Sequence, residues 1–292
     1  MHKNALLIGN GLNRVSTNAA WTDLLQNLQS TFKLECFSEY TNYPLEFERI
    51  DQAVIAQGHP NQMSAKRLIA QRLPPVSDNS LIRQFAQLPT DSILTTNYDY
   101  NIEMAINPQY NRRNQKASTK ETKHSLNRFT VVNNRKIWHI HGEAYCPNSI
   151  CMGYEQYCSH LSKLHTTLTQ PKQNYSRRPY LDHVLLHNDD PNPPWPVLFF
   201  THDIYIVGLQ LSLMEIDLWW LLSYRKRMML LKPKLHICNE IHYYYKEGEA
   251  TDEQRSLLES MGVVLHPVPL IRNNWAKMYT AILNQLTNIL IK

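Results

Sequence analysis

The sequence is poor in glycine, with 8 among 292 residues, less than half of the roughly 7% that is usual. In such a chain each glycine invites a backbone explanation, because glycine is the residue that tolerates tight turns and close approaches. Five of them lie at the ends of apolar runs, where strands turn into loops or helices. They are Gly9, Gly11, Gly142, Gly208 and Gly262.

The chain also lacks the features of a secreted or membrane protein. It has five cysteines, an odd number, and its N-terminal apolar run is too short for a secretory signal. We therefore expect a cytoplasmic protein with reduced thiols and no disulfide framework. The longest apolar stretch, residues 204–222, contains Gln210, Glu215 and Asp217, so it predicts a buried strand and helix and no membrane span.

Excess charge is confined to one segment. The formal net charge is +5, and residues 112–136 hold eight basic side chains against Glu121 alone, so the rest of the chain is slightly acidic. This basic insert predicts either a solvated, mobile loop or a surface for a partner, nucleic acid included.

The patterning predicts an α/β fold. Hydrophobic residues make up 43% and charged residues 19%, which excludes wholesale disorder. Short apolar runs alternate with amphipathic helical patterns, as in a Rossmann-like, mainly parallel sheet with flanking helices. We expect strands over residues 5–8, 92–95, 129–132, 136–140, 203–207, 235–238 and 263–266, and helices over about 21–28, 61–73, 78–88, 154–168, 213–224, 251–262 and 275–290.

Two stretches interrupt this alternation. Residues 31–85 and 146–200 are expected to form a helical cap over the sheet, within a single domain that spans residues 1–292. Within the second stretch, residues 170–196 are rich in Pro, Asn and Asp, which predicts an irregular surface excursion.

Polar residues and glycines directly follow five of the expected strands, at the sheet edge where parallel α/β folds bind ligands. Gly9 and Gly11 leave backbone N–H groups at a helix start, which favours a pyrophosphate, although a plain tight turn explains them equally well. Asn97 and Asp99 could instead cap a helix, and His141 could be a turn residue. The residues collected at this rim are Gly9, Asn10, Gly11, Asn13, Arg14, Thr95, Asn97, Asp99, His141, Gly208, Gln210 and Asn239.

These motifs resemble those of the sirtuin-like (silent-information-regulator-type) family. Residues 9–11 are similar to the family's Gly-Ala-Gly, and residues 95–99 are similar to its Thr-Gln-Asn-Ile-Asp, with Glu103 at the spacing of a frequent glutamate. His141 and Gly142 resemble its His-Gly pair. Residues 208–210, 235–239 and 262–268 resemble its later Gly-Thr-Ser, Asn-ended strand and final strand.

The chain departs from the deacylating sirtuins in two ways. It lacks the two Cys-x-x-Cys pairs that hold their zinc, and Gly-Leu-Gln at residues 208–210 replaces Gly-Thr-Ser. We expect no metal; the alternative is zinc at the widely spaced Cys146, Cys151 and Cys158 with His160. In these departures the chain resembles a divergent bacterial branch similar to NAD+ hydrolases of antiphage defence.

The resemblance implies an NAD+ glycohydrolase that produces nicotinamide and ADP-ribose, with NAD+ as its substrate. It implies that Asp99 accepts the carboxamide N–H, that Asn97 fixes the ribose or the attacking water, and that His141, with an ordinary pKa near 6.5, is the base. The remaining dinucleotide contacts would come from Gly9, Asn10, Gly11, Asn13, Arg14, Thr95, Gly208, Gln210 and Asn239.

Other functions stay open at this point. The chain could be a catalytically silent module that senses NAD+ or ADP-ribose through a partner, or an NAD+-dependent deacylase or ADP-ribosyltransferase. Because unrestrained NAD+ cleavage would be toxic, we expect control by homo-oligomerisation or by a regulatory partner protein. Residues 112–136 and 170–196 are the segments where we expect that control.

Overall fold

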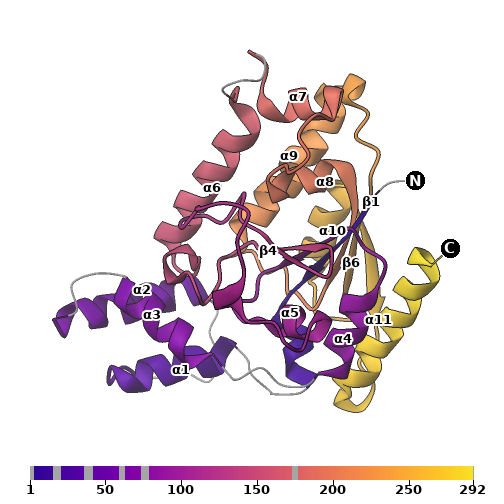
Figure 1. Cartoon of the computed structure of the whole chain (residues 1–292). Coiled ribbons are helices and arrows are strands. Elements are labelled where there is room, and N and C mark those ends of the chain that lie inside the picture. Colours follow the sequence, from indigo (N-terminus) through magenta and orange to yellow (C-terminus); the bar gives the residue numbers. More distant parts are fainter. Residues whose placement is uncertain are drawn as a thin grey trace.

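The computed structural model describes residues 3–15, 21–35, 42–58, 63–73, 79–172 and 177–291. One sheet has the strand order β3-β4-β2-β1-β5-β6-β7, in which β3 is antiparallel to β4 and all other neighbours are parallel. This confirms the expected α/β, Rossmann-like fold (Figure 1). The strands are β1 (Lys3–Ile8), β2 (Ser92–Thr95), β3 (Thr130–Val132), β4 (Arg135–His139), β5 (His202–Val207), β6 (Ile241–Lys246) and β7 (Val263–Val268).

The central strand β1 is buried on both faces of the sheet, as its continuous apolar run requires. Leu6 and Ile8 belong to the core on one face, and Ala5 and Leu7 belong to the core on the other. In Figure 1, α9 and α11 lie on opposite sides of the strands. The first face is covered by α4 (Ser80–Gln87), α5 (Asn101–Ile106) and α11 (Trp275–Leu290), and the second by α6 (Tyr154–Thr169), α7 (Tyr180–His187), α8 (Leu198–Thr201), α9 (Ile216–Leu231) and α10 (Asp252–Ser260).

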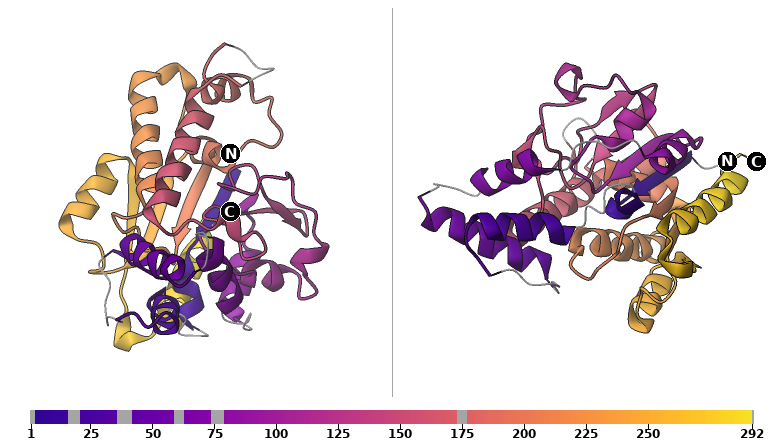
Figure 2. Two further views of the ribbon diagram at one scale, coloured as in Figure 1. Left: turned by 90° about the vertical axis from the view of Figure 1, so that its left-hand side faces the viewer. Right: turned by 90° about the horizontal axis from the view of Figure 1, so that it is seen from below.

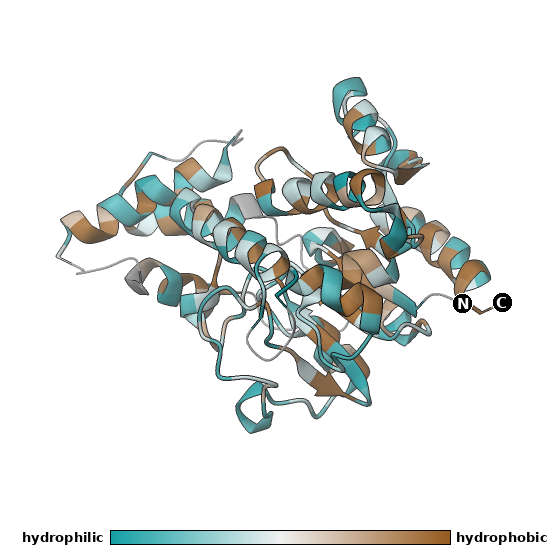
Figure 3. Ribbon diagram, turned by 90° about the horizontal axis from the view of Figure 1, so that it is seen from above, coloured by the Kyte–Doolittle hydropathy of each residue, from teal (hydrophilic) through white to brown (hydrophobic). Residues whose placement is uncertain are grey.

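Three further helices form a separate group that projects from the body of the molecule (Figures 2 and 3). They are α1 (Trp21–Thr31), α2 (Tyr43–Ala56) and α3 (Met63–Arg72). Their shared core includes Leu28, Phe47 and Ile50 and is joined to the body through Tyr98 and Ile150. The helix α2 contacts α6, and α3 contacts the turn at Pro147–Ser149, so the two interrupting stretches meet. The helix α4 packs with the sheet instead.

Most of the expected elements are present; the main differences are one strand and the helices α2, α7 and α8. The strand expected at residues 235–238 is wrong, because that segment holds a 3₁₀ turn at Pro233–Leu235 and β6 begins at Ile241. Residues 170–196 contain the helix α7, although their Pro, Asn and Asp content predicted an irregular segment. The helix α2 was not predicted. None of the helices in the described ranges is long and apolar enough to cross a membrane.

Two local features of the fold follow directly from side-chain type. Asn133 and Asn134 form the tight turn between β3 and β4, with φ values of 46° and 65° that asparagine tolerates. Thr251 and Gln254 form a capping box at the start of α10, because each side chain accepts the other's backbone N–H at 3.1 and 3.0 Å.

Candidate functional site

A cleft opens at the carboxyl ends of the strands, between β1 and β5. The strand order reverses at this point, and such a reversal leaves the crevice in which open α/β sheets bind their ligands. The cleft holds about 1250 Å³ of space that no atom fills, with the solvent at its mouth included. Of the predicted site residues, it is lined by Asn10, Gly11, Arg14, His141, Gly208 and Gln210.

The glycines of the two central turns allow the backbones to pack against each other. The N–H of Gly9 donates to Val207 at 3.0 Å, and that of Gly11 donates to Gly208 at 2.7 Å. A Cβ on Gly9 would lie 2.5 Å from the Gly208 oxygen, so only glycine fits there. The N–H groups of both glycines therefore donate to backbone carbonyls of the protein. They do not form the pyrophosphate-binding site that their position in the sequence suggested.

Asn13 and Asp99 lie in a polar network that ties the end of β1 to the end of β2. Asn13 Nδ2 donates to Asp99 Oδ2 at 3.0 Å, and the Asn101 backbone N–H donates to Asp99 Oδ1 at 2.9 Å. Burial raises the pKa of Asp99, against the hydrogen bond from Asn101. Neither Asn13 nor Asp99 lines the cleft. Both side chains therefore tie β1 to β2, and the predicted contact of Asp99 with the carboxamide gains no support from its position.

Thr95 and Asn97 are buried and do not line the cleft, whereas Thr96 and Tyr98 do. The Thr95 hydroxyl donates to the Ile8 carbonyl at 2.8 Å and accepts the N–H of Asn97 at 3.1 Å. Within the described chain, the amide oxygen Oδ1 of Asn97 has no hydrogen-bond partner. A buried amide left in this way has capacity for a water or ligand, which suits the predicted role of Asn97.

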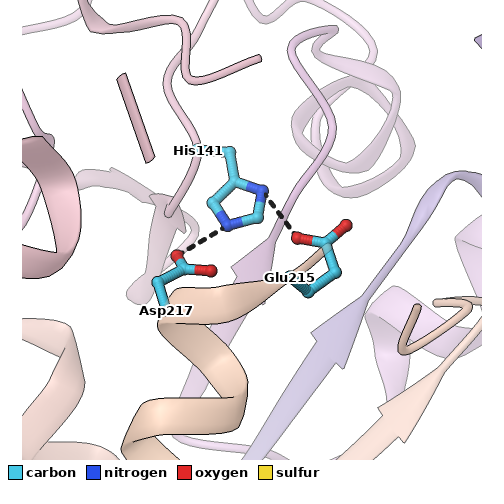
Figure 4. Close-up of side chains that lie close together, drawn as sticks. All are labelled: His141, Glu215 and Asp217. Carbon is cyan, nitrogen blue, oxygen red and sulfur yellow. Dashed lines mark hydrogen bonds and ion pairs between the residues drawn. The ribbon is translucent and has the colours of Figure 1, made fainter. Parts of the chain in front are cut away.

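His141 lies between two carboxylates from the start of α9 (Figure 4). Its Nε2 is 2.9 Å from Asp217 Oδ2, and its Nδ1 is 3.8 Å from Glu215 Oε2. The Tyr157 hydroxyl donates to the same Glu215 oxygen at 3.0 Å. His160 also lies near Asp217, with its Nε2 3.6 Å from Asp217 Oδ2.

These carboxylates change the charge of His141. Burial disfavours the imidazolium, but Asp217 and, more weakly, Glu215 outweigh burial and raise the pKa of His141 to about 9. This pKa lies above the reference value near 6.5 on which the predicted role of His141 as a base rests. For the neighbouring His160, burial outweighs the attraction of Asp217 and lowers the pKa to about 4. At neutral pH the cluster thus holds a protonated His141 and a neutral His160.

The charge of His141 leads to a prediction about pH. If cleavage of NAD+ requires the free base, kcat/KM should rise with pH through the neutral range and level off near the pKa of about 9. Asp217→Asn removes the main group that raises this pKa, so the rise should occur at lower pH. Initial rates from pH 6 to about 10 for both proteins provide the test. Superimposable profiles would show that His141 does not limit the reaction as a base.

The segment that follows His141 is anchored by a buried ionic network. Glu143 accepts hydrogen bonds from Arg112 at 2.6 and 3.0 Å, forms an ion pair with Arg128 at 2.8 Å, and accepts the Tyr100 hydroxyl at 2.9 Å. Burial opposes the charge of Glu143, but Arg112, His139 and Arg128 lower its pKa to about 2. Since Arg112 and Arg128 belong to the basic insert, that segment is fixed to the site and is not simply a solvated, mobile loop.

A second buried pair, His139 and Glu103, holds the backbone of Asn97 in place. His139 Nε2 lies 2.8 Å from Glu103 Oε1, and its Nδ1 lies 2.7 Å from the Asn97 carbonyl oxygen. Burial lowers the pKa of His139, but Glu103 outweighs this effect and raises the pKa to about 9. Protonated His139 can then donate to both groups, so it holds the backbone of Asn97 in place.

Another part of the cleft carries two cations and two aromatic rings, with the carboxylate Glu249 also in its lining. The Arg14 guanidinium lies 5.5 Å and the Lys246 ammonium 6.0 Å from the centre of the Trp275 ring. Tyr279 stacks on Trp275 at 6.3 Å, and all four residues line the cleft. Cations beside an aromatic face suit a phosphorylated ligand with a planar base.

Asn239 was predicted to bind the ligand, but it lies at the other end of the sheet from the cleft. Its Nδ2 donates to the carbonyls of Phe199 and His202, at 3.0 and 2.6 Å, at the amino ends of β5 and β6. The cleft lies at the carboxyl ends of the same strands. The ligand-binding interpretation of Asn239 is therefore wrong, and the cause is the misplaced strand at residues 235–238.

Possible metal ligands occur in one group among the described residues. His141, Glu215 and Asp217 have one ligand atom each within 4.8 Å of one another. Cys146, Cys151 and Cys158 do not form such a group with His160 in the described ranges, so the zinc alternative gains no support.

Glu215 and Asp217 were not among the predicted site residues. In the sequence they interrupt the longest apolar stretch, and this interruption is the signal that was available. Acidic residues that interrupt a buried segment require a partner, and the partner here is His141.

Comparison with protein families agrees with the sirtuin-like resemblance. Residues 91–188, which include β2, β4 and His141, match the family model described as a SIR2-like domain. No curated protein matches the sequence.

Proposed function

Since residues 91–188 carry a SIR2-like domain, which supports a sirtuin-type, NAD+-related function, we propose that the chain is an NAD+ glycohydrolase. It would bind NAD+ in the cleft and cleave the bond between nicotinamide and ribose. The observation that carries the proposal is that His141, paired with Glu215, lines the same cleft as the cations Arg14 and Lys246. The amide oxygen of Asn97, which has no partner among the described residues, is buried just after β2. The charges of the cleft suit a molecule with a cationic ring and a pyrophosphate.

The reaction needs little acid catalysis, because the leaving group is already cationic. The bond between ribose C1′ and the ring nitrogen breaks with its electron pair passing to the nitrogen, so nicotinamide leaves neutral. The ribosyl cation that remains is attacked by water, and the water loses its proton to His141 in its free-base form or to solvent. The products are nicotinamide, ADP-ribose and one proton.

The helical cap completes the cleft in this proposal. Leu25 of α1 and Tyr43 and Pro44 of α2 line it together with Met152 and Tyr157. We propose that residues 1–292 act as one NAD-binding unit, with the cap excluding water from the reacting bond. Exclusion of bulk water strengthens the electrostatic interactions on which this chemistry depends.

The cationic end leads to a binding prediction. We expect Trp275→Ala to weaken NAD+ binding by about tenfold or more, because stacking of a base on an aromatic ring contributes about 1–3 kcal/mol. Trp275→Phe keeps an aromatic face and should retain most of the affinity. Calorimetric titration with NAD+ measures both variants. Equal affinities for the alanine variant and the wild type would show that the adenine of NAD+ does not stack on Trp275.

Competing functions are separated by the products. Incubation with NAD+ should release nicotinamide and ADP-ribose in equal amounts. Attachment of the ADP-ribosyl group to a protein would indicate a transferase, and transfer to an acetyl group would indicate a deacylase. NAD+ binding without release of nicotinamide would indicate a sensing module.

We further propose a cytoplasmic role in bacterial antiphage defence through NAD+ depletion, with control by homo-oligomerisation or a partner protein. The basic insert supports a controlling surface, since Lys116, Lys120 and Lys123 are exposed while Arg112 and Arg128 anchor it. Deleting residues 112–136 would remove β3 and the anchor, so the test is substitution of the three exposed lysines by glutamine. Unchanged oligomeric state and unchanged activation would exclude this surface.

A further inference from the structure

Glu215 is the acidic side chain of the His141 cluster that reaches the cleft. It lines the cleft and its side chain is 18% exposed, whereas Asp217 is fully buried at 0%. The Tyr157 hydroxyl, on α6, holds one of its oxygens at 3.0 Å. A carboxylate fixed in this way can act on a ligand without first being reoriented.

The cluster has an excess of negative charge. Glu215 and Asp217 bring two carboxylates against the one positive charge of His141, and His160 is neutral. Burial and the nearby Asp217 raise the pKa of Glu215, while the His141 charge and the Tyr157 hydroxyl oppose this rise, so the excess is present when Glu215 is ionised. The cations of the cleft, Arg14 and Lys246, lie at the Trp275 end. The cleft therefore offers a negative charge where the proposed function places the pyridinium ring.

We propose that Glu215 is a further catalytic and specificity-determining residue, which faces the positive charge of the substrate. This inference rests on the proposed function, because it assumes that the nicotinamide end of the dinucleotide lies beside His141. In the bound state the positive charge is on the pyridinium ring. As the bond breaks, the charge moves to the ribose, and Glu215 remains close to it throughout.

The role of Asp217 differs from that of Glu215. Asp217 is buried behind His141 and contacts it at 2.9 Å, so it acts through His141 as a positioning residue. The roles of the two carboxylates can therefore be distinguished by measuring different properties of their variants. Loss of the Asp217 charge should move the pH profile, whereas loss of the Glu215 charge should change the discrimination between oxidised and reduced dinucleotide.

The test compares binding of NAD+ and NADH, which differ at the ring by one positive charge. The wild type should prefer NAD+, and Glu215→Gln should reduce that preference by about five- to tenfold, as expected for one charge pair at about 4 Å in a partly wet site. Glu215→Asp keeps the charge and should keep the preference. Glu249→Gln removes a carboxylate from the other part of the same cleft and should leave the preference unchanged.

Turnover provides the second readout. Glu215→Gln should lower kcat by about 10²–10³, the usual effect of removing one preorganised group that stabilises a developing charge. An unchanged preference and an unchanged kcat in Glu215→Gln would overturn the inference. If the wild type releases no nicotinamide but the preference still depends on Glu215, the proposed hydrolase fails while the charge recognition stands.

The same residues could instead bind a divalent cation, and the experiment detects that outcome. Titrations are repeated after EDTA treatment and after addition of Mn²⁺ or Zn²⁺. Binding or turnover that disappears with EDTA and returns with the metal would make Glu215 a metal ligand and would overturn the direct role proposed for it. Results that do not respond to either treatment support direct contact between Glu215 and the substrate.

Discussion

Glu143→Gln is expected to destabilise the protein by about 3–5 kcal/mol, because it leaves buried cations without their counter-charge. Arg112 and Arg128 both pair with Glu143, and the side chains of all three are 8% exposed or less. Urea unfolding at neutral pH measures the loss. Glu259→Gln, at an exposed position of α10, is the matched control and should change stability by less than about 0.5 kcal/mol.

The same network predicts a direction with pH. The pKa of Glu143 is lowered from its ordinary value of 4.5 to about 2, so its contribution to stability is complete above 4.5 and is lost as the pH falls toward 2. The wild type should therefore lose stability over this range, and Glu143→Gln should lose less. If Glu143→Gln is as stable as the wild type at neutral pH, then Arg112 and Arg128 are satisfied by water or by other partners.

Asn97→Ala and His141→Ala are each expected to lower NAD+ cleavage by about 10²–10⁴, the usual effect of removing a positioned base or orienting group. The amide oxygen of Asn97 is buried without a partner in the described chain, and His141 lines the cleft between Glu215 and Asp217. Rates of nicotinamide release, with NAD+ affinity measured in parallel, provide the test.

A matched control addresses folding. Asn239→Ala replaces an equally buried asparagine that donates to Phe199 and His202 at the opposite end of the sheet. It should lose stability but keep kcat in the fraction that remains folded. Retained wild-type turnover in Asn97→Ala or His141→Ala would remove that residue from the mechanism.

Local patterns predicted the fold because the sheet follows from local signals. Apolar runs that stop at Gly9 and Gly208 mark the carboxyl ends of β1 and β5, and the turn at Asn133 and Asn134 marks the β3–β4 hairpin. The strand β6 was misplaced because its Tyr-Tyr-Tyr core is buried through aromatic rings, while the aliphatic residues Leu235 and Ile237 precede it.

The site was predictable only in part, because its chemistry depends on contacts between distant segments. The strand-end rule brought Asn10, Gly11, His141 and Gln210 to one cleft. It could not show that Asp99 turns toward Asn13, since a residue at a strand end can face either the ligand or its neighbour. The bracketing of His141 by Glu215 and Asp217 joins β4 to α9 across more than 70 positions, and no local pattern encodes that distance.

Purified protein is incubated with NAD+, the products are separated by chromatography, and the same sample is titrated with NAD+ in a thermal-shift assay. We expect equal amounts of nicotinamide and ADP-ribose from the wild type, little from Asn97→Ala and His141→Ala, and a melting temperature that rises with NAD+. A wild type that forms no nicotinamide and shows no thermal shift with NAD+ would contradict the nucleotide site itself.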